Sequence, residues 1–269
     1  MVRHDPQAPR FVFGQMGGQM GGQIGGQIGP AKWLNPGADL ASAWCRIGAG
    51  FNVAPASSTP DLEELLVETV RAGRDNARLI VIAATWLSRF GGLVARHRLR
   101  RMAIERLDAV GRAVLGLHLD TVREHTRSAH FNEVIAVCRP LPSAEPLFHV
   151  HDRHPALRDR LERRATALSR RWNLLAEPIE LKPDALYAPS WVMRLNPSFA
   201  LRADYEGDLR CSIVEEILRD PGAGDSELEL ARRCGATRTA VRHALDRLAL
   251  AGRVERERVG RRSAVRVAV

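Results

Sequence analysis

The chain has 269 residues, enough for one large or two ordinary domains, and hydrophobic residues make up 45% of it. Aromatic residues account for only 5%, so a core must consist mainly of alanine, leucine, valine and isoleucine. The net charge of +9 favours an anionic partner, most simply nucleic acid, although the scarcity of lysine (only Lys32 and Lys182) is also typical of a GC-rich genome.

Cysteine spacing and hydropathy exclude several classes of protein. The four cysteines lie at least 23 positions apart, so there is no CxxC pair, zinc-ribbon spacing or disulfide framework. No apolar segment of signal-peptide length follows the N-terminus, and the most apolar run, residues 79–87, is about half as long as a membrane-spanning helix. We therefore expect a cytoplasmic protein with no membrane segment, no cofactor and no bound metal.

The first 58 residues have the composition of a disordered arm. Residues 14–29 read GQMGGQMGGQIGGQIG, a glycine- and glutamine-rich repeat that is costly to order and too poor in apolar residues to form a core. Turn-forming stretches such as NPG and APASSTP continue this character. We predict a disordered arm over residues 1–58.

A helical domain is predicted over residues 59–175. Thr59 is the expected N-cap of a first helix that ends near Gly73, because Pro60 suits the first helical position and acidic residues follow it. The other expected helices span about 76–90, from 93 past 114, and 155–174. The next segment, residues 176–209, contains four prolines and is predicted to be a connector whose apolar residues pack along a domain.

The C-terminal residues 210–269 carry the sharpest pattern. Amphipathic helices are expected over 212–220, from about 226 to 234, and 237–251. Two alternating runs, RVERERV and SAVRVAV, follow around a turn at Gly260 to Arg262 and predict a β-hairpin. Three helices and a hairpin in this order are typical of a winged helix-turn-helix. The fold class is therefore mainly α, with a helical domain followed by a C-terminal winged helix-turn-helix.

The turn and the third helix of this module contain the candidate DNA-binding residues. Gly235 is expected to reverse the chain with a positive φ, and helical spacing buries Val241 and Leu245 while the opposite face points outward. Arginine can pair with guanine through two hydrogen bonds, and threonine can contact a phosphate or a thymine methyl group. The candidate DNA-binding residues are Thr237, Arg238, Thr239, Arg242, His243, Arg258, Arg261 and Arg262.

The local charge and one family resemblance favour the same interpretation. Residues 232–269 contain 11 arginines and 3 acidic residues. The stretch TAVRHALDRLALAGRVERERVGRRSAVRV resembles the winged-helix domains of GntR-family bacterial transcription regulators, a resemblance that covers about residues 210–269. Two features depart from that family: the module is C-terminal, and the hairpin lacks a glycine-rich tip followed by threonine. The resemblance therefore implies the winged-helix fold and DNA binding, but not the effector domain of that family.

These observations predict a sequence-specific regulator of transcription that binds double-stranded DNA as a homodimer and is not an enzyme. Helix 237–251 would read the major groove, and hairpin 253–269 would act as the wing. Residues 59–175 would dimerise, sense a ligand or dock a protein partner. One alternative is an antitoxin-like or defence-system regulatory partner that restrains an enzyme through its helical domain and autoregulates through the winged helix. A second alternative is an enzyme that acts on nucleic acid, although no catalytic motif is present.

Two weaker motifs have alternative interpretations. His149, His151 and His154 could hold a metal ion, but the absence of further ligands at suitable spacing favours an ordinary polar loop. The run His97 to Arg101 could contact phosphates as a second basic patch, or could simply be the solvated face of a helix.

Overall fold

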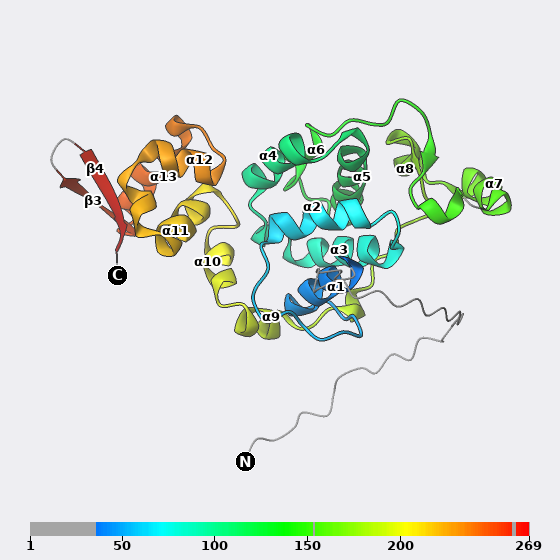
Figure 1. Ribbon diagram of the computed structural model, residues 1–269, viewed down its shortest axis with the longest axis horizontal. Coiled ribbons are helices and arrows are strands. Elements are labelled where there is room, and N and C mark those ends of the chain that lie inside the picture. Colours follow the sequence, from blue (N-terminus) through cyan, green and yellow to red (C-terminus); the bar gives the residue numbers. More distant parts are fainter. Residues whose placement is uncertain (1–35, 153, 260–261, 269) are drawn as a thin grey trace, which may run out of the picture. The chain divides into compact units, whose positions relative to one another are not determined.

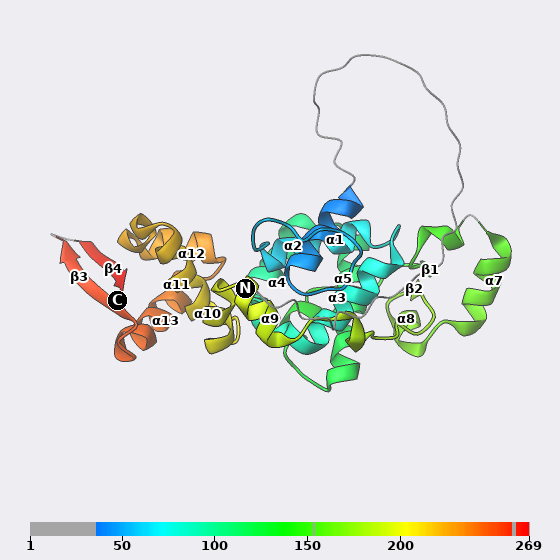
Figure 2. The same ribbon diagram turned by 90° about the horizontal axis from the view of Figure 1, so that it is seen from below.

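The computed structural model describes residues 36–152, 154–259 and 262–268, which are mainly helical, with 63% helix and 6% strand (Figures 1 and 2). The first helices are α1 (Pro36–Arg46), α2 (Leu62–Ala72), α3 (Ala77–Phe90), α4 (Arg96–Arg106), α5 (Ala109–Thr126), α6 (Asn132–Ile135), α7 (Pro155–Arg164) and α8 (Ala167–Arg171). The remaining helices are α9 (Pro189–Leu195), α10 (Ser198–Asp204), α11 (Leu209–Arg219), α12 (Glu227–Cys234) and α13 (Arg238–Leu250).

Strands are few and short in the described ranges. A parallel pair joins β1 (Glu145–Pro146) to β2 (Leu174–Leu175), and an antiparallel hairpin joins β3 (Val254–Val259) to β4 (Arg262–Val267). The described residues also contain four 3₁₀ turns: η1 (Gly91–Leu93), η2 (His149–His151), η3 (Pro183–Ala185) and η4 (Pro221–Asp225). No helix in these ranges has the length and apolar character needed to cross a bilayer.

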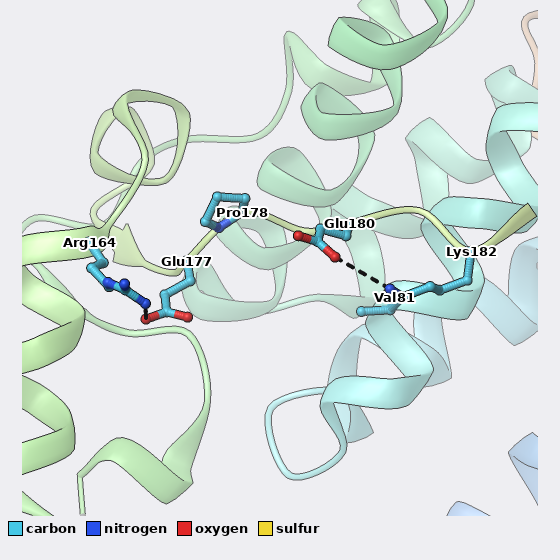
Figure 3. A pocket seen from close by; sticks show the side chains of 6 residues that line it. All are labelled: Val81, Arg164, Glu177, Pro178, Glu180 and Lys182. Atoms are coloured by element: carbon cyan, nitrogen blue, oxygen red, sulfur yellow. Dashed lines mark hydrogen bonds and ion pairs between the residues drawn. The ribbon is translucent and has the colours of Figure 1, made fainter. Parts of the chain in front are cut away.

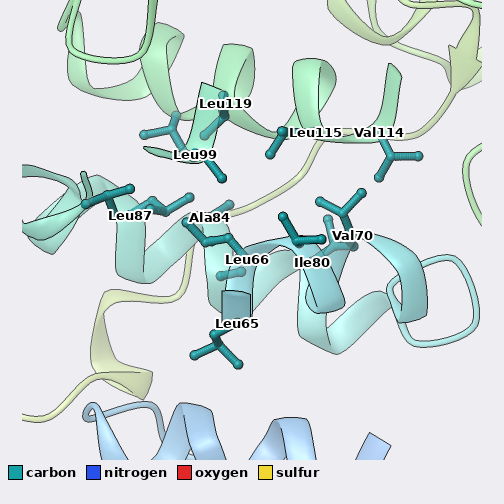
Figure 4. Packing of buried hydrophobic residues seen from close by; sticks show 14 of the residues in the cluster. Leu65, Leu66, Val70, Ile80, Ala84, Leu87, Leu99, Val114, Leu115 and Leu119 are labelled. Atoms are coloured by element: carbon teal, nitrogen blue, oxygen red, sulfur yellow. The ribbon is translucent and has the colours of Figure 1, made fainter. Parts of the chain in front are cut away.

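The larger hydrophobic core forms where α2, α3, α4 and α5 pack against one another. Helix α3 is apolar nearly all round and lies centrally, as expected for a helix that is buried on most of its surface. Figure 4 shows how side chains from neighbouring helices meet there, among them Leu66, Val70, Ile80, Ala84, Leu87, Val114, Leu115 and Leu119. Gly116 of α5 allows the Trp172 ring to approach closely, because a Cβ at this position would lie 2.2 Å from the ring.

The predicted disorder of residues 1–58 is wrong from Pro36 onward. Helix α1 places Trp44 and the following Ile47 in the large core, where the Trp44 indole donates to Thr69 Oγ1 at 2.8 Å. The Trp86 indole donates to the Ile47 carbonyl oxygen at 2.8 Å. The composition of the nearby glycine-rich repeat suggested disorder for the whole N-terminal region. Residues 36–46 nevertheless form a short amphipathic helix, which is stabilised by tertiary packing. The repeat itself, residues 14–29, lies outside the described residues.

Three helix boundaries differ from the prediction, because a polar residue that was expected inside a helix acts as an N-cap instead. The N-cap of α2 is Asp61, whose Oδ1 accepts from the Glu64 amide at 3.1 Å, whereas Thr59 donates to Asn196 at 2.8 Å. The long helix expected from residue 93 breaks before Asp108, which caps α5. The helix expected over 155–174 likewise breaks before Thr166, which caps α8. Short polar side chains favour caps over helix interiors, and this preference decides all three boundaries.

The proline-rich segment 176–209 packs against the protein, as predicted, but it contains two helices rather than only irregular chain. Pro189 occupies the first turn of α9, a position that needs no amide hydrogen, so it begins a helix instead of breaking one. Val192 and Phe199 are buried in the large core, whereas Leu201 packs against a second, smaller core.

The second core is formed by α11, α12, α13 and the β3–β4 hairpin. Its buried members include Ile213, Ile217, Leu230, Val241, Leu245, Leu248, Val254 and Val265. Both cores lie in one compact unit of the chain. The fold is therefore mainly helical, with a small antiparallel sheet at its C-terminal end.

A buried ion cluster joins the two cores. Arg202 of α10 donates to Glu63 of α2 at 2.7 Å and to Glu215 of α11 at 2.8 Å. Glu63 has 0% of its side chain exposed and also accepts from Arg98 and from the Ala95 amide. Burial opposes the charged form of Arg202, but Glu63 and Glu215 together raise its pKa. Such a cluster is stable only because every charge has a close partner.

Candidate nucleic-acid interface

The turn between α12 and α13 has the geometry that its sequence predicts. Ser226 caps α12 and accepts from the Glu229 amide at 3.3 Å. Gly235 ends the helix with a φ of 70°, and its amide donates to the Ala231 carbonyl oxygen. A residue with a side chain rarely adopts this backbone conformation, so the glycine is what permits the chain to reverse here.

Helix α13 has one buried face and one exposed face, as predicted. Val241, Leu245 and Leu248 are buried in the small core. Predicted reading residues on the opposite face are all exposed: Thr237, Arg238, Thr239, Arg242 and His243. Thr237 also has a structural role, because its hydroxyl oxygen caps α13 by accepting from the Ala240 amide at 3.2 Å. The structure therefore brings five of the eight predicted site residues onto one accessible surface.

The remaining three predicted residues belong to the hairpin. Its register pairs Val254 with Val267 and Arg256 with Val265, and Val254 and Val265 face the small core. Arg261 lies outside the described residues, as do the side chains of Arg258 and Arg262.

Sequence reasoning missed Glu227, which lies between two of the predicted reading residues. Its Oε2 is 3.4 Å from Arg238 Nε and 3.1 Å from Arg242 Nη2. Glu227 is the first residue of α12, a position where an acidic residue is ordinarily explained by the helix dipole. The pairing depends on how α12 and α13 pack across the turn, and no local pattern reveals it.

Several other arginines of the module are also paired with acidic residues. Arg232 and Arg233 both bond Glu229, and these hydrogen bonds lower the pKa of Glu229 to about 2. Arg256 pairs with Asp246 at 2.7 Å. Residues 209–269 as a whole contain 13 arginines and 9 acidic residues, so the helices before residue 232 offset part of the positive charge that follows them. The positive potential is consequently smaller than the last 38 residues suggest.

The basic run His97 to Arg101 is largely engaged within the protein. Arg98 pairs with Asp61 at 2.5 Å, and burial lowers the pKa of His97 to about 4. Arg101 of α4 donates to the Arg232 carbonyl oxygen at 2.7 Å and packs over Gly235, where a Cβ would lie 2.7 Å from its Nε. This run therefore anchors α4, and its contact with the α12–α13 turn was not predicted.

The histidine motif lies on a short turn beside Asp75. His149 and His151 lie on the η2 turn, where His149 Nδ1 is 2.9 Å from Asp75 Oδ1. In the described ranges, no group of three or more histidine, cysteine, aspartate or glutamate side chains could hold a metal ion.

A surface groove of about 690 Å³ lies between α3 and the segment that follows β2 (Figure 3). Its charged side chains bond each other: Arg164 is 3.7 Å from Glu177, and Lys182 is 3.3 Å from Glu180. These side chains therefore form two exposed ion pairs along the groove.

The α12–α13 turn, the exposed face of α13 and the hairpin thus form the candidate interface. Comparison of the chain with protein families, with curated proteins and with solved structures finds no match.

Proposed function

We propose that the protein is a sequence-specific regulator of transcription that binds double-stranded DNA and is not itself an enzyme. In this proposal α11, α12, α13 and the β3–β4 hairpin form a winged helix-turn-helix. Helix α13 enters the major groove, and the hairpin contacts the DNA backbone as a wing. The observation that carries the proposal is the exposed polar face of α13 directly after the positive-φ turn at Gly235.

The chemistry of that face fits the edges of base pairs. Arg238 and Arg242 have 61% and 54% of their side chains exposed, so both can reach a partner outside the protein. Their guanidinium groups can donate two hydrogen bonds to guanine O6 and N7, and the Thr239 methyl group can contact a thymine. Contacts of this kind specify sequence, whereas contacts to phosphates mainly fix position.

A homodimer is part of the proposal. Two copies related by a two-fold axis would place their α13 helices about one turn of DNA apart, so the preferred site would be a palindrome. The dimer contact, or the docking of a partner protein, is assigned to the helices within residues 59–175, which supply most of the large core.

The test is a selection of random duplex DNA by the full-length protein, followed by sequencing of the bound pool and titration of binding against salt. We expect an enriched palindrome that is lost in the Arg238→Ala/Arg242→Ala variant. Arg160→Ala/Arg164→Ala is the matched control, because it removes the same charge from two exposed arginines of α7. Among the acidic residues of the described ranges, these arginines pair only with Glu177. An unenriched pool with a steep salt dependence would refute sequence-specific regulation and leave only phosphate binding.

A further inference from the structure

Glu227 is a carboxylate placed on the surface that is proposed to approach an anionic ligand. It has 25% of its side chain exposed, and one of its oxygen atoms, Oε2, bonds both Arg238 and Arg242. The two arginines are four residues apart, so they lie on the same face of α13 and repel each other. A single acidic group between them offsets this repulsion and restricts both side chains.

The bonding atoms determine which donors remain available. Arg238 bonds Glu227 through Nε only, at 3.4 Å, so its two terminal nitrogen atoms can still form a planar fork. Arg242 bonds Glu227 through Nε at 3.3 Å and Nη2 at 3.1 Å, which leaves the second hydrogen of Nη2 and both hydrogens of Nη1 for another acceptor. The pairing therefore holds both arginines by the Nε side of the guanidinium group and leaves the terminal edge of each available to contact a base through two hydrogen bonds.

We propose that Glu227 is a specificity-determining positioning residue of the interface. This inference rests on the proposed function. Glu227 fixes Arg238 with its terminal fork directed outward, which reduces the side-chain entropy lost when the arginine meets a guanine. Its negative charge also weakens the attraction of both arginines for phosphates, which all DNA sequences share. Both effects favour the preferred sequence over random DNA.

The direct test compares wild type with Glu227→Gln in the random-duplex selection and in salt titrations. The variant should bind random duplex about threefold to tenfold more tightly at low salt, with a salt dependence steeper by about one released ion, because the substitution removes one negative charge from the interface. It should also accept more than one base at the position read by Arg238, so that its preference for the selected site falls about tenfold. Glu227→Ala should behave in the same way.

Glu229→Gln is the matched control. Glu229 lies in the same first turn of α12 and carries the same charge, but it bonds Arg232 and Arg233 instead of the two reading arginines. We expect this variant to bind random DNA somewhat more tightly without any change in the selected sequence. Urea unfolding of each variant checks that the fold is retained.

The outcomes separate the two proposals. If wild type enriches no sequence, the proposed function fails. If wild type enriches a site, and Glu227→Gln selects it as strictly as wild type or Glu229→Gln loses it equally, then Glu227 has no positioning role and only this inference fails.

Discussion

Replacement of His118 should change how the stability of the protein depends on pH. His118 lies on α5 and is buried in the helical part of the chain. Burial lowers its pKa to about 4 from an ordinary value of 6.5, and a hydrogen bond with the Ile80 backbone acts in the opposite direction. The neutral imidazole is therefore the form that the folded state accepts.

The sign and size of the effect follow from proton linkage. Below pH 6.5 the unfolded chain binds a proton at His118 while the folded chain does not, so the free energy of unfolding falls as the pH is lowered. With pKa values of 6.5 and about 4, this contribution amounts to about 2 kcal/mol between pH 7 and pH 5 and levels off below pH 4 at about 3 kcal/mol. His118→Leu removes the titrating group and keeps a side chain of similar size, so its stability should depend less on pH by this amount.

The assay is urea unfolding followed by circular dichroism at pH 7, 6 and 5, with free energies from linear extrapolation. His125→Leu is the control, because it removes an exposed histidine from the same helix. Parallel curves for wild type and His118→Leu between pH 7 and pH 5 would refute the assignment of a buried neutral imidazole.

Three further substitutions test the packing by urea unfolding. Gly116→Ala should lower the free energy of unfolding by about 1–3 kcal/mol, because its Cβ would overlap the Trp172 ring. Gly92→Ala is the control and should be nearly neutral, because no atom lies within 4 Å of the added Cβ. An equal loss of stability in both variants would contradict this reason. Glu63→Gln should cost about 3–5 kcal/mol, because it leaves the buried Arg202 partly uncompensated; a loss below about 1 kcal/mol would exclude a tightly coupled cluster. Gly235→Ala should cost about 1–2 kcal/mol from its positive φ, and unchanged stability would indicate that the turn adopts another conformation.

Local sequence patterns predicted the C-terminal helices well. The buried stripe of α13 with Val241 and Leu245 and the turn at Gly235 both depend on residues a few positions apart. Helical spacing, cap chemistry and backbone sterics act over a few residues, so a local sequence pattern is enough to predict such features. The order of three helices and a hairpin followed directly from them.

Features that depend on distant residues were not predictable in this way. Arg101 contacts the backbone of Arg232, which is 131 positions away in the sequence. Glu227 meets Arg242 only because two helices cross at a turn, and Trp44 enters a core formed mostly by later helices. In each case tertiary packing creates the contact, and the residue type alone is compatible with an exposed position.

The cluster around Arg202 has a consequence for how the chain could be divided. A cut before Asp208 would separate the last three helices and the hairpin from Arg202, and would leave Glu215 without its buried partner. The N-terminal fragment would keep the bond between Arg202 and Glu63, but its Arg202 would lack Glu215. The C-terminal helices are therefore poorly suited to expression as a separate domain. A fusion protein that contains them should begin no later than Ser198, so that it includes α10.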